Sequence, residues 1–100
     1  MTKILFVCTG NTCRSPMAEG LLRHLLAEKL KVAESDLEEQ GYHVESAGTS
    51  AMGGILPSPA AVEVLRSRQI DISGHRSQAL TMEQVHRADY IFTMTRSHLE

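Results

Sequence analysis

The sequence predicts an α/β fold with a parallel sheet, organised as a single domain over residues 1–100. Three short apolar runs typical of strands, at residues 3–7, 42–46 and 90–94, alternate with segments of helical periodicity. Strands separated by helices pair in parallel through right-handed crossovers. With 100 residues and 42% hydrophobic content, the chain can bury one modest core, which favours one domain over two.

The first strand is predicted from Lys3 to Val7, and its apolar character indicates burial on both faces. This strand ends directly at Cys8. Pro16 suits the first position of a helix that has Ser15 as its N-cap. Apolar residues recur along that helix at steps of three and four, which predicts a stripe packed in the core. The stripe consists of Met17, Leu21, Leu22, Leu25, Leu26 and Leu30.

The middle of the chain contains a second strand between two less regular segments. Residues 32–40 are acidic, and they either prolong the first helix or form a short second one that ends at Gly41. The strand at residues 42–46 is followed by a loop of small residues from 47 to 58. Pro59 then begins a helix.

The last predicted helix begins at a capping box. Thr81 is followed three residues later by Gln84, and this pattern predicts a short helix that ends at Arg87. Residues 90–94 form the third predicted strand, and residues 96–100 are compatible with the start of a further helix.

The charge balance and the apolar pattern argue against several partners. Ten Lys and Arg against twelve Asp and Glu give a net charge of -2, which supplies no basic field for nucleic acid. No run approaches the roughly 20 apolar residues of a membrane span, and the first apolar run is too short for a signal peptide. We expect a soluble, cytoplasmic protein that binds neither nucleic acid nor membrane.

The cysteines and histidines give no sign of a metal or a cofactor. A disulfide between Cys8 and Cys13 would close a very small loop and constrain little of the chain. The five histidines show no paired spacing of the kind that zinc sites use. We therefore expect no metal and no cofactor.

The segment that carries chemistry is residues 8–15, CTGNTCRS, between the first strand and the first helix. A loop at a helix N-terminus points backbone N–H groups inward, and the helix dipole adds positive charge, so a dianionic phosphate fits there. Gly10 is expected to supply the unusual backbone angles of such a cradle. The Arg14 guanidinium can grip two phosphate oxygens. The same surroundings favour a thiolate at Cys8.

These features suggest one reaction. Cys8 would attack phosphorus in line and form a phosphocysteine, the N–H groups and Arg14 would stabilise the equatorial oxygens, and water would hydrolyse the intermediate. A structural alternative exists for each residue taken alone. Cys8 and Arg14 could be a buried strand-end cysteine and a surface arginine, His75 a turn residue, and Cys13 a small core residue.

The run VCTGNTCRSPMAE, residues 7–19, resembles the signature of the low-molecular-weight protein tyrosine phosphatases. Similar elements follow at residues 46–49, 59–65, 75–77 and 88–95. The resemblance implies a three-layer sandwich with a central parallel sheet and catalytic roles for Cys8 and Arg14. It also implies that the phosphate is bound by Thr9, Gly10, Asn11, Thr12, Cys13 and Ser15, with Ser46 and His75 supporting the loop. Cys13 matches a cysteine that traps the oxidised nucleophile as a disulfide.

The match to this family is incomplete at the C-terminal side. Family members are longer, and their general acid is an aspartate in an Asp-Pro pair, which this sequence does not contain. The contexts of Asp36, Asp71 and Asp89 match other parts of the family pattern. We therefore expect a domain that lacks its C-terminal part and binds phosphate better than it turns over.

Two substrate classes and two other functions stay open. The family mostly hydrolyses phosphotyrosine, but a bacterial branch acts on protein phosphoarginine and resembles this chain in having a threonine at position 12. Residues 50–57 contain no aromatic side chain to pack on a phenol, which weakens the tyrosine case. An arsenate reductase would need cysteines downstream of Cys13, and the sequence has none. A weakly catalytic phosphate-binding module is the other alternative.

Overall fold

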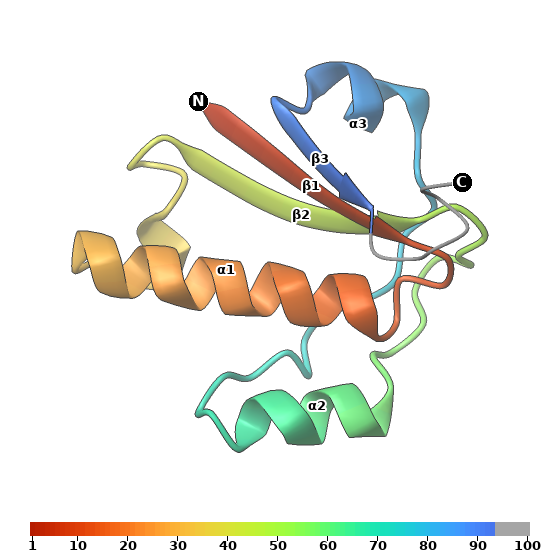
Figure 1. Cartoon of the computed structure of the whole chain (residues 1–100), viewed down its shortest axis with the longest axis horizontal. Coiled ribbons are helices and arrows are strands. Elements are labelled where there is room, and N and C mark those ends of the chain that lie inside the picture. Colours follow the sequence, from red (N-terminus) through yellow and green to blue (C-terminus); the bar gives the residue numbers. More distant parts are fainter. Residues whose placement is uncertain (94–100) are drawn as a thin grey trace.

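The computed structural model describes residues 1–93 and shows a three-stranded parallel sheet with helices on both sides (Figure 1). The strands are β1 (Thr2–Cys8), β2 (Tyr42–Gly48) and β3 (Tyr90–Thr93), in the order β2-β1-β3. The helices are α1 (Arg14–Leu30), α2 (Pro59–Arg66) and α3 (Met82–Arg87), with a 3-10 turn, η1, at Glu34–Asp36. Because all strands run the same way, their C-terminal ends meet at one edge, where Cys8 pairs with Gly48.

The sheet separates two layers of helix, which confirms the predicted three-layer α/β architecture. α1 runs along one face with α2 beyond it, and α3 lies on the other side of the sheet (Figure 1). Two consecutive residues of β2 face opposite sides of the sheet. Ser46 donates a hydrogen bond to Glu19 of α1, whereas Glu45 accepts one from Gln84 of α3. The core on the α3 side is formed by Leu5, Val7 and Ala47 with Leu80 and Ala88.

The predicted leucine stripe of α1 is wrong in part. Leu21 and Leu25 are 37% and 50% exposed, whereas the buried positions of the helix are Ser15, Pro16, Gly20 and Ala27. Small residues face inward because α1 lies very close to the cluster of Ala61, Leu65, Ile70 and Ile72. A Cβ at Gly20 would lie 2.5 Å from Ile72 Cγ2, so only glycine permits this distance.

The predicted N-cap of α1 is also wrong. The helix begins at Arg14, two residues earlier than expected, and its N-cap residue is Cys13, whose side chain makes no capping hydrogen bond. Ser15 lies inside the first turn and is fully buried. Its hydroxyl contacts Cys8 and Asn11 and is therefore not available to cap the helix.

The other helices and strands begin and end close to the residues predicted from the sequence. The acidic segment forms only the short turn η1, and the chain reverses at Gly41, which has a φ of 92°. β2 is two residues longer than predicted, because Ala47 and Gly48 continue the parallel pairing with Val7 and Cys8 of β1. The Pro59 helix start and the capping box of Thr81 and Gln84 are confirmed. Of the predicted third strand, Met94 lies outside the described residues, as does the possible helix at 96–100.

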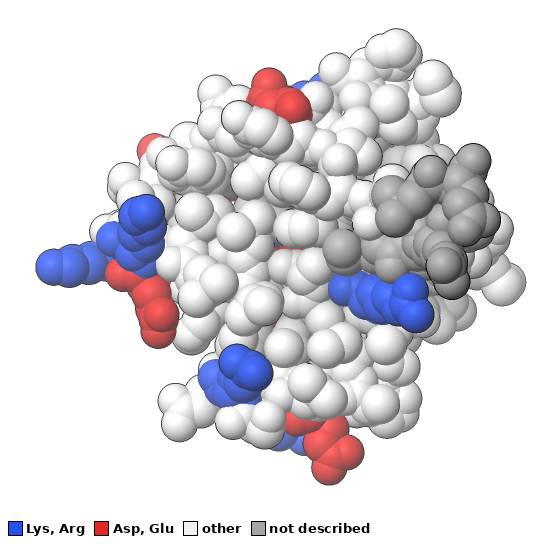
Figure 2. Space-filling view, in the orientation of Figure 1, with Lys and Arg blue, Asp and Glu red and all other residues white. Residues whose placement is uncertain are grey.

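The surface carries charges of both signs. On the face shown in Figure 2, basic and acidic side chains lie in small separate groups between larger uncharged areas. Within residues 1–93, no helix combines the length and the apolar character that crossing a membrane requires.

Candidate active site

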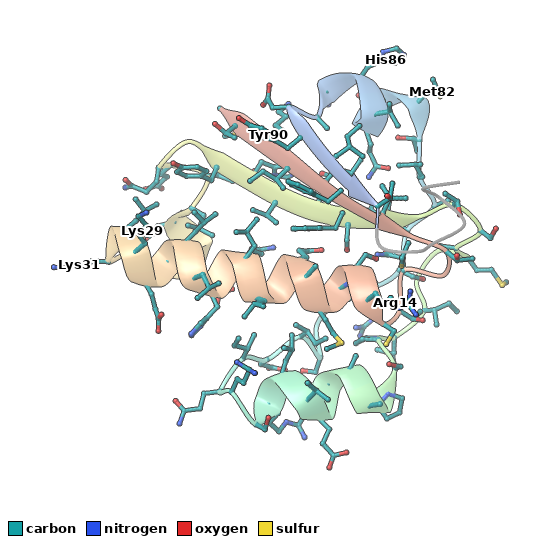
Figure 3. The ribbon with its side chains drawn as sticks, viewed as in Figure 1. Arg14, Lys29, Lys31, Met82, His86 and Tyr90 are labelled. Atoms are coloured by element: carbon teal, nitrogen blue, oxygen red, sulfur yellow. The ribbon has the colours of Figure 1, made fainter. Side chains whose placement is uncertain are left out.

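The loop between β1 and α1 lies at the C-terminal edge of the sheet, where parallel α/β folds place their ligands. Residues 8–14 line a hollow of about 160 Å³. Arg14 stands at the start of α1 beside this loop, and Lys29 and Lys31 mark the far end of the helix (Figure 3). The chain thus places a cysteine and an arginine on one small concavity at a helix N-terminus.

The loop carbonyls are held by groups outside the loop. Four of them accept a hydrogen bond from the surrounding segments: Cys8 O from Thr49 N at 2.9 Å, Thr9 O from Ser50 N at 2.9 Å, Asn11 O from His75 Nε2 at 3.1 Å and Thr12 O from Ser58 N at 2.7 Å. In a trans peptide the N–H of the next residue points opposite to the carbonyl. The N–H groups of Thr9, Gly10, Thr12 and Cys13 are therefore turned away from these outer segments, toward the concave side.

Asn11 is the centre of the loop. It is fully buried and has a left-handed backbone, with φ 55°. Every polar group of this residue makes a hydrogen bond. Its N–H donates to Cys8 Sγ at 3.1 Å and its carbonyl accepts from His75, while its Oδ1 accepts from Gln78 N at 2.8 Å and its Nδ2 donates to Ser15 Oγ at 2.8 Å and to Ser46 Oγ at 2.9 Å.

Gly10 was expected to supply the unusual backbone angles of the cradle, but the left-handed residue of the loop is Asn11. Among residues 1–93, the glycines with positive φ are Gly41 and Gly54. Asparagine tolerates this backbone region better than most residues. Asn11 also gains the side-chain hydrogen bonds that hold it there, so the special position of the loop falls on the asparagine.

Cys8 is a buried residue, 4% exposed, and its sulfur lies beneath the loop. It accepts the Asn11 N–H and lies 2.8 Å from Ser15 Oγ. Since Ser15 Oγ already accepts a hydrogen bond from Asn11 Nδ2, the serine proton is free to point at the sulfur. Two donors thus converge on one sulfur, an arrangement that stabilises negative charge there.

The other predicted residues lie as follows. Ser46 and His75, the residues expected to support the loop, both make a hydrogen bond with Asn11. Cys13 is exposed, so its alternative as a core residue is wrong. Both cysteines are free. Thr9, Gly10, Thr12 and Arg14 line the hollow together with Cys8, Asn11 and Cys13.

Two residues of this network were missed by the sequence reasoning. Glu19 of α1 accepts a hydrogen bond from Ser46 Oγ at 2.7 Å, and it pairs with Arg23 at 3.2 Å. Its position within the run 7–19 was the available signal. Gln78 donates its main-chain N–H to Asn11 Oδ1 and its Nε2 to Ser46 O, both at 2.8 Å. No local pattern marks Gln78, because its partners are distant in sequence.

A larger hollow of about 330 Å³ lies elsewhere, between β1, β2 and α3. There His43 bonds through Nδ1 to Glu38 and through Nε2 to Glu45. Burial alone lowers the pKa of His43, but the hydrogen bonds to Glu45 and Glu38 outweigh burial and raise this pKa above its usual range. The hollow contains no cysteine. Within the described part of the chain, no group of three or more His, Cys, Asp or Glu is placed to hold a metal ion.

The chain is similar to known proteins of one family. The profile of a family described as low molecular weight phosphotyrosine protein phosphatase matches residues 3–100. A probable low molecular weight protein-tyrosine-phosphatase, EpsP of Ralstonia solanacearum, is 47% identical over 91% of this chain and 54% of its own length. A protein-arginine-phosphatase of Bacillus subtilis is 40% identical over 95% of this chain and 57% of its own.

A solved structure is similar as well. A mutant of the YwlE arginine phosphatase with a phosphorylated active-site serine is 39% identical, with a TM-score of 0.78 over 97% of this chain and 57% of that one. The chain spans little more than half the length of the curated relatives named above. Because the family profile covers nearly all of its residues, the chain belongs to the low molecular weight phosphotyrosine protein phosphatase family.

Proposed function

We propose that this chain carries the phosphate-binding loop and the nucleophile of a protein phosphatase that acts on phosphotyrosine or phosphoarginine. The observation that carries the proposal is the position of Cys8 Sγ, which lies under the loop with the Asn11 N–H and the Ser15 hydroxyl directed at it. The partner is then a phosphorylated protein. Two free cysteines suit a reducing compartment such as the cytoplasm.

In this proposal the Cys8 thiolate attacks phosphorus while the bond to the leaving oxygen or nitrogen breaks. The leaving group takes up a proton from solvent water and departs, and a phosphocysteine remains. Water then attacks the phosphocysteine, which releases inorganic phosphate and restores the thiolate. Charge on the equatorial oxygens is stabilised by the inward N–H groups of Thr9, Gly10, Thr12 and Cys13 and by the bidentate guanidinium of Arg14.

The helix contributes to the same charge stabilisation. α1 has 17 residues and begins at Arg14, so the positive end of its dipole lies at the loop. The side chain of Cys13 does not cap this helix end, so it does not compete with a dianionic phosphate for the site.

The supporting residues have a separate role in the proposal. Ser46 and His75 hold Asn11 from two sides, and Asn11 in turn holds Cys8 and Ser15. A loop with its polar groups already paired need not reorganise when phosphate arrives. We assign no proton donor for the leaving group within residues 1–100, since the sequence contains no Asp-Pro pair. Substrates with good leaving groups should therefore react best.

In this proposal, Thr12 is the residue that discriminates between phosphotyrosine and phosphoarginine. Its carbonyl is fixed by Ser58 N, so the loop of residues 49–58 flanks this side of the hollow. That loop exposes Met52, Ile55 and Leu56 and contains no aromatic ring. Phosphoarginine is supported by the threonine, and by the 40% identity to a protein-arginine-phosphatase. Phosphotyrosine is supported by the 47% identity to EpsP.

Rapid mixing with an activated aryl phosphate tests the proposal. The expected result is a burst of aryl alcohol equal to the concentration of chain, together with a phosphate on the Cys8 peptide in quenched samples. Cys8→Ala should show neither the burst nor the phosphopeptide, and it should still bind inorganic phosphate. A chain that binds phosphate without any burst is a binding module, and the phosphatase proposal would then be wrong.

A further inference from the structure

We propose that Gln78 is a positioning residue that fixes the orientation of the Asn11 side-chain amide and thereby directs the Ser15 proton to Cys8. The inference rests on the proposed role of Cys8 as nucleophile. It adds a residue that lies 67 positions after Asn11 and takes no part in the loop itself.

The first step concerns the amide of Asn11. The two ends of a side-chain amide have nearly the same shape, so the hydrogen-bond partners decide which end points where. The main-chain N–H of Gln78 can only donate, and it lies 2.8 Å from the Asn11 amide. The end that faces Gln78 must therefore be the oxygen Oδ1. The NH2 group is then forced toward the hydroxyls of Ser15 and Ser46.

The second step concerns the two serine protons. Each hydroxyl has one proton, and each hydroxyl oxygen here already accepts from Asn11 Nδ2. The Ser46 proton goes to the carboxylate of Glu19, which accepts it at 2.7 Å. The Ser15 proton goes to Cys8 Sγ at 2.8 Å. The Gln78 N–H at one end, and the Glu19 carboxylate and the Cys8 sulfur at the other end, thus set the direction of both serine protons.

A reversed amide would break this order. Asn11 Oδ1 would then face the serines and accept a proton from one of them, and the NH2 group would face the Gln78 N–H, donor against donor. If the Ser15 proton turned to Asn11, the sulfur would lose its second donor. The loss of a hydrogen bond to the charged sulfur disfavours the thiolate on the order of tenfold or more.

The side chain of Gln78 holds the main chain where this function needs it. Its Nε2 donates to Ser46 O at 2.8 Å, and its own carbonyl accepts from Gly48 N at 2.9 Å. Gln78 lies outside the helices and strands, so such contacts to β2 set the place of its N–H. A residue without a side-chain donor keeps the N–H but loses the contact to Ser46.

The test measures the thiolate itself. In a Cys13→Ser background, Cys8 is the single thiol, and its alkylation by iodoacetamide is followed across pH. Gln78→Met keeps the side-chain length but removes the donor. We expect its alkylation profile to move to higher pH, with a rate at neutral pH lower by about threefold to tenfold. An unchanged profile in a folded Gln78→Met chain overturns the inference.

Gln84→Met is the matched control. This glutamine also makes side-chain bonds, to Thr81 N and to Glu45, but it does not touch Asn11. Its loss should lower the stability of the chain and leave the alkylation profile in place. An equal shift in both variants would mean that general loosening moves the profile, and the specific role of Gln78 would be refuted.

The wild-type chain gives a second measurement if Gln78→Met does not fold. In its ¹⁵N NMR spectrum, the Gln78 main-chain amide and the Asn11 NH2 group should both be protected from exchange and should shift as Cys8 titrates. The absence of this response would overturn the inference. Alkylation needs no phosphate turnover, so a profile that depends on Gln78 without an aryl phosphate burst would support the inference and contradict the phosphatase proposal.

Discussion

The hydroxyl oxygen of Ser15, in the first turn of α1, lies 2.8 Å from the sulfur of Cys8, the last residue of β1. A helix residue thereby contacts the last residue of a strand, and the loop between them closes over the sulfur. Since Ser15 and Asn11 are both fully buried, the polar groups that serve Cys8 are shielded from water and depend on one another. Function and stability are therefore coupled at this site.

Removing the Ser15 hydroxyl should lower both the stability of the chain and the reactivity of Cys8. Ser15→Ala removes one donor to Cys8 and leaves one hydrogen of the buried Asn11 side-chain NH2 group without its acceptor. We expect the free energy of unfolding to fall by about 1–3 kcal/mol and the alkylation rate of Cys8 at neutral pH to fall about tenfold. Urea unfolding and alkylation kinetics measure the two effects. Ser58→Ala, which removes the N-cap of α2, should cost about 1 kcal/mol and leave Cys8 alkylation unchanged.

Arginine and lysine should not be equivalent at position 14. Arg14→Lys keeps the positive charge but loses the planar pair of donors, and we expect turnover of an aryl phosphate to fall by about 100-fold or more. Steady-state kinetics measure this change. Arg87→Lys is the control, because Arg87 is exposed on α3 and pairs with Glu83. A loss of less than about threefold for Arg14→Lys would remove Arg14 from the proposed mechanism.

The distance between Gly48 and the loop predicts a sharp difference between two glycines. A Cβ at Gly48 would lie 2.5 Å from Thr9 O and 3.0 Å from Asn11 N, whereas a Cβ at Gly53 would meet nothing within 4 Å. Gly48→Ala should therefore displace the loop, cost about 1–3 kcal/mol of stability and lower turnover. Gly53→Ala should have neither effect. Equal thermal unfolding temperatures for the two variants would show that the loop does not depend on this close packing.

Substrate preference should respond to the side chain at position 12. Thr12→Ile replaces a hydroxyl with apolar bulk beside the hollow, which favours a flat phenyl ring over a guanidinium. We expect the ratio of phosphotyrosine to phosphoarginine hydrolysis to rise. The measurement is the ratio of the two kcat/KM values in wild type and variant. If both rates change by the same factor, position 12 does not discriminate between the substrates.

The stability of the chain should depend on pH through His43. Its folded-state pKa lies above the ordinary value of 6.5, so its contribution is fully present below that pH and is lost as the pH rises through the folded pKa. His43→Gln should therefore destabilise the chain more at about pH 5.5 than at about pH 8.5. Urea unfolding of both proteins at these pH values measures the difference. A larger effect at the higher pH would contradict the assigned direction.

The sequence was sufficient for the parts of the fold that depend on local pattern. The strand at 3–7, the Pro59 helix and the capping box at Thr81 each follow from residues close together in the chain, and the structure confirms them. The sequence also predicted Cys8 and Arg14 as site residues, because their spacing falls between a strand and a helix, and both residues line the hollow.

What the sequence did not reveal depends on contacts between distant segments. The bond from Gln78 to Asn11 spans 67 residues and the bond from Ser46 to Glu19 spans 27, and no periodicity encodes either. The buried network also explains the wrong N-cap, since the Ser15 hydroxyl contributes more to the site than to the helix end. The exposed Leu21 was assigned to the core because the pattern cannot show how closely Ile72 approaches Gly20.

The central claim is that the N–H groups of the loop converge on the hollow above Cys8 and bind a dianion there. A titration of the ¹⁵N-labelled chain with inorganic phosphate, followed by NMR, tests it most directly. We predict saturable shifts of the main-chain amides of Gly10, Thr12 and Cys13 and of the Arg14 side chain, with little change around His43. Shifts confined to the hollow at His43, or no saturable shifts in residues 9–15, would contradict the account.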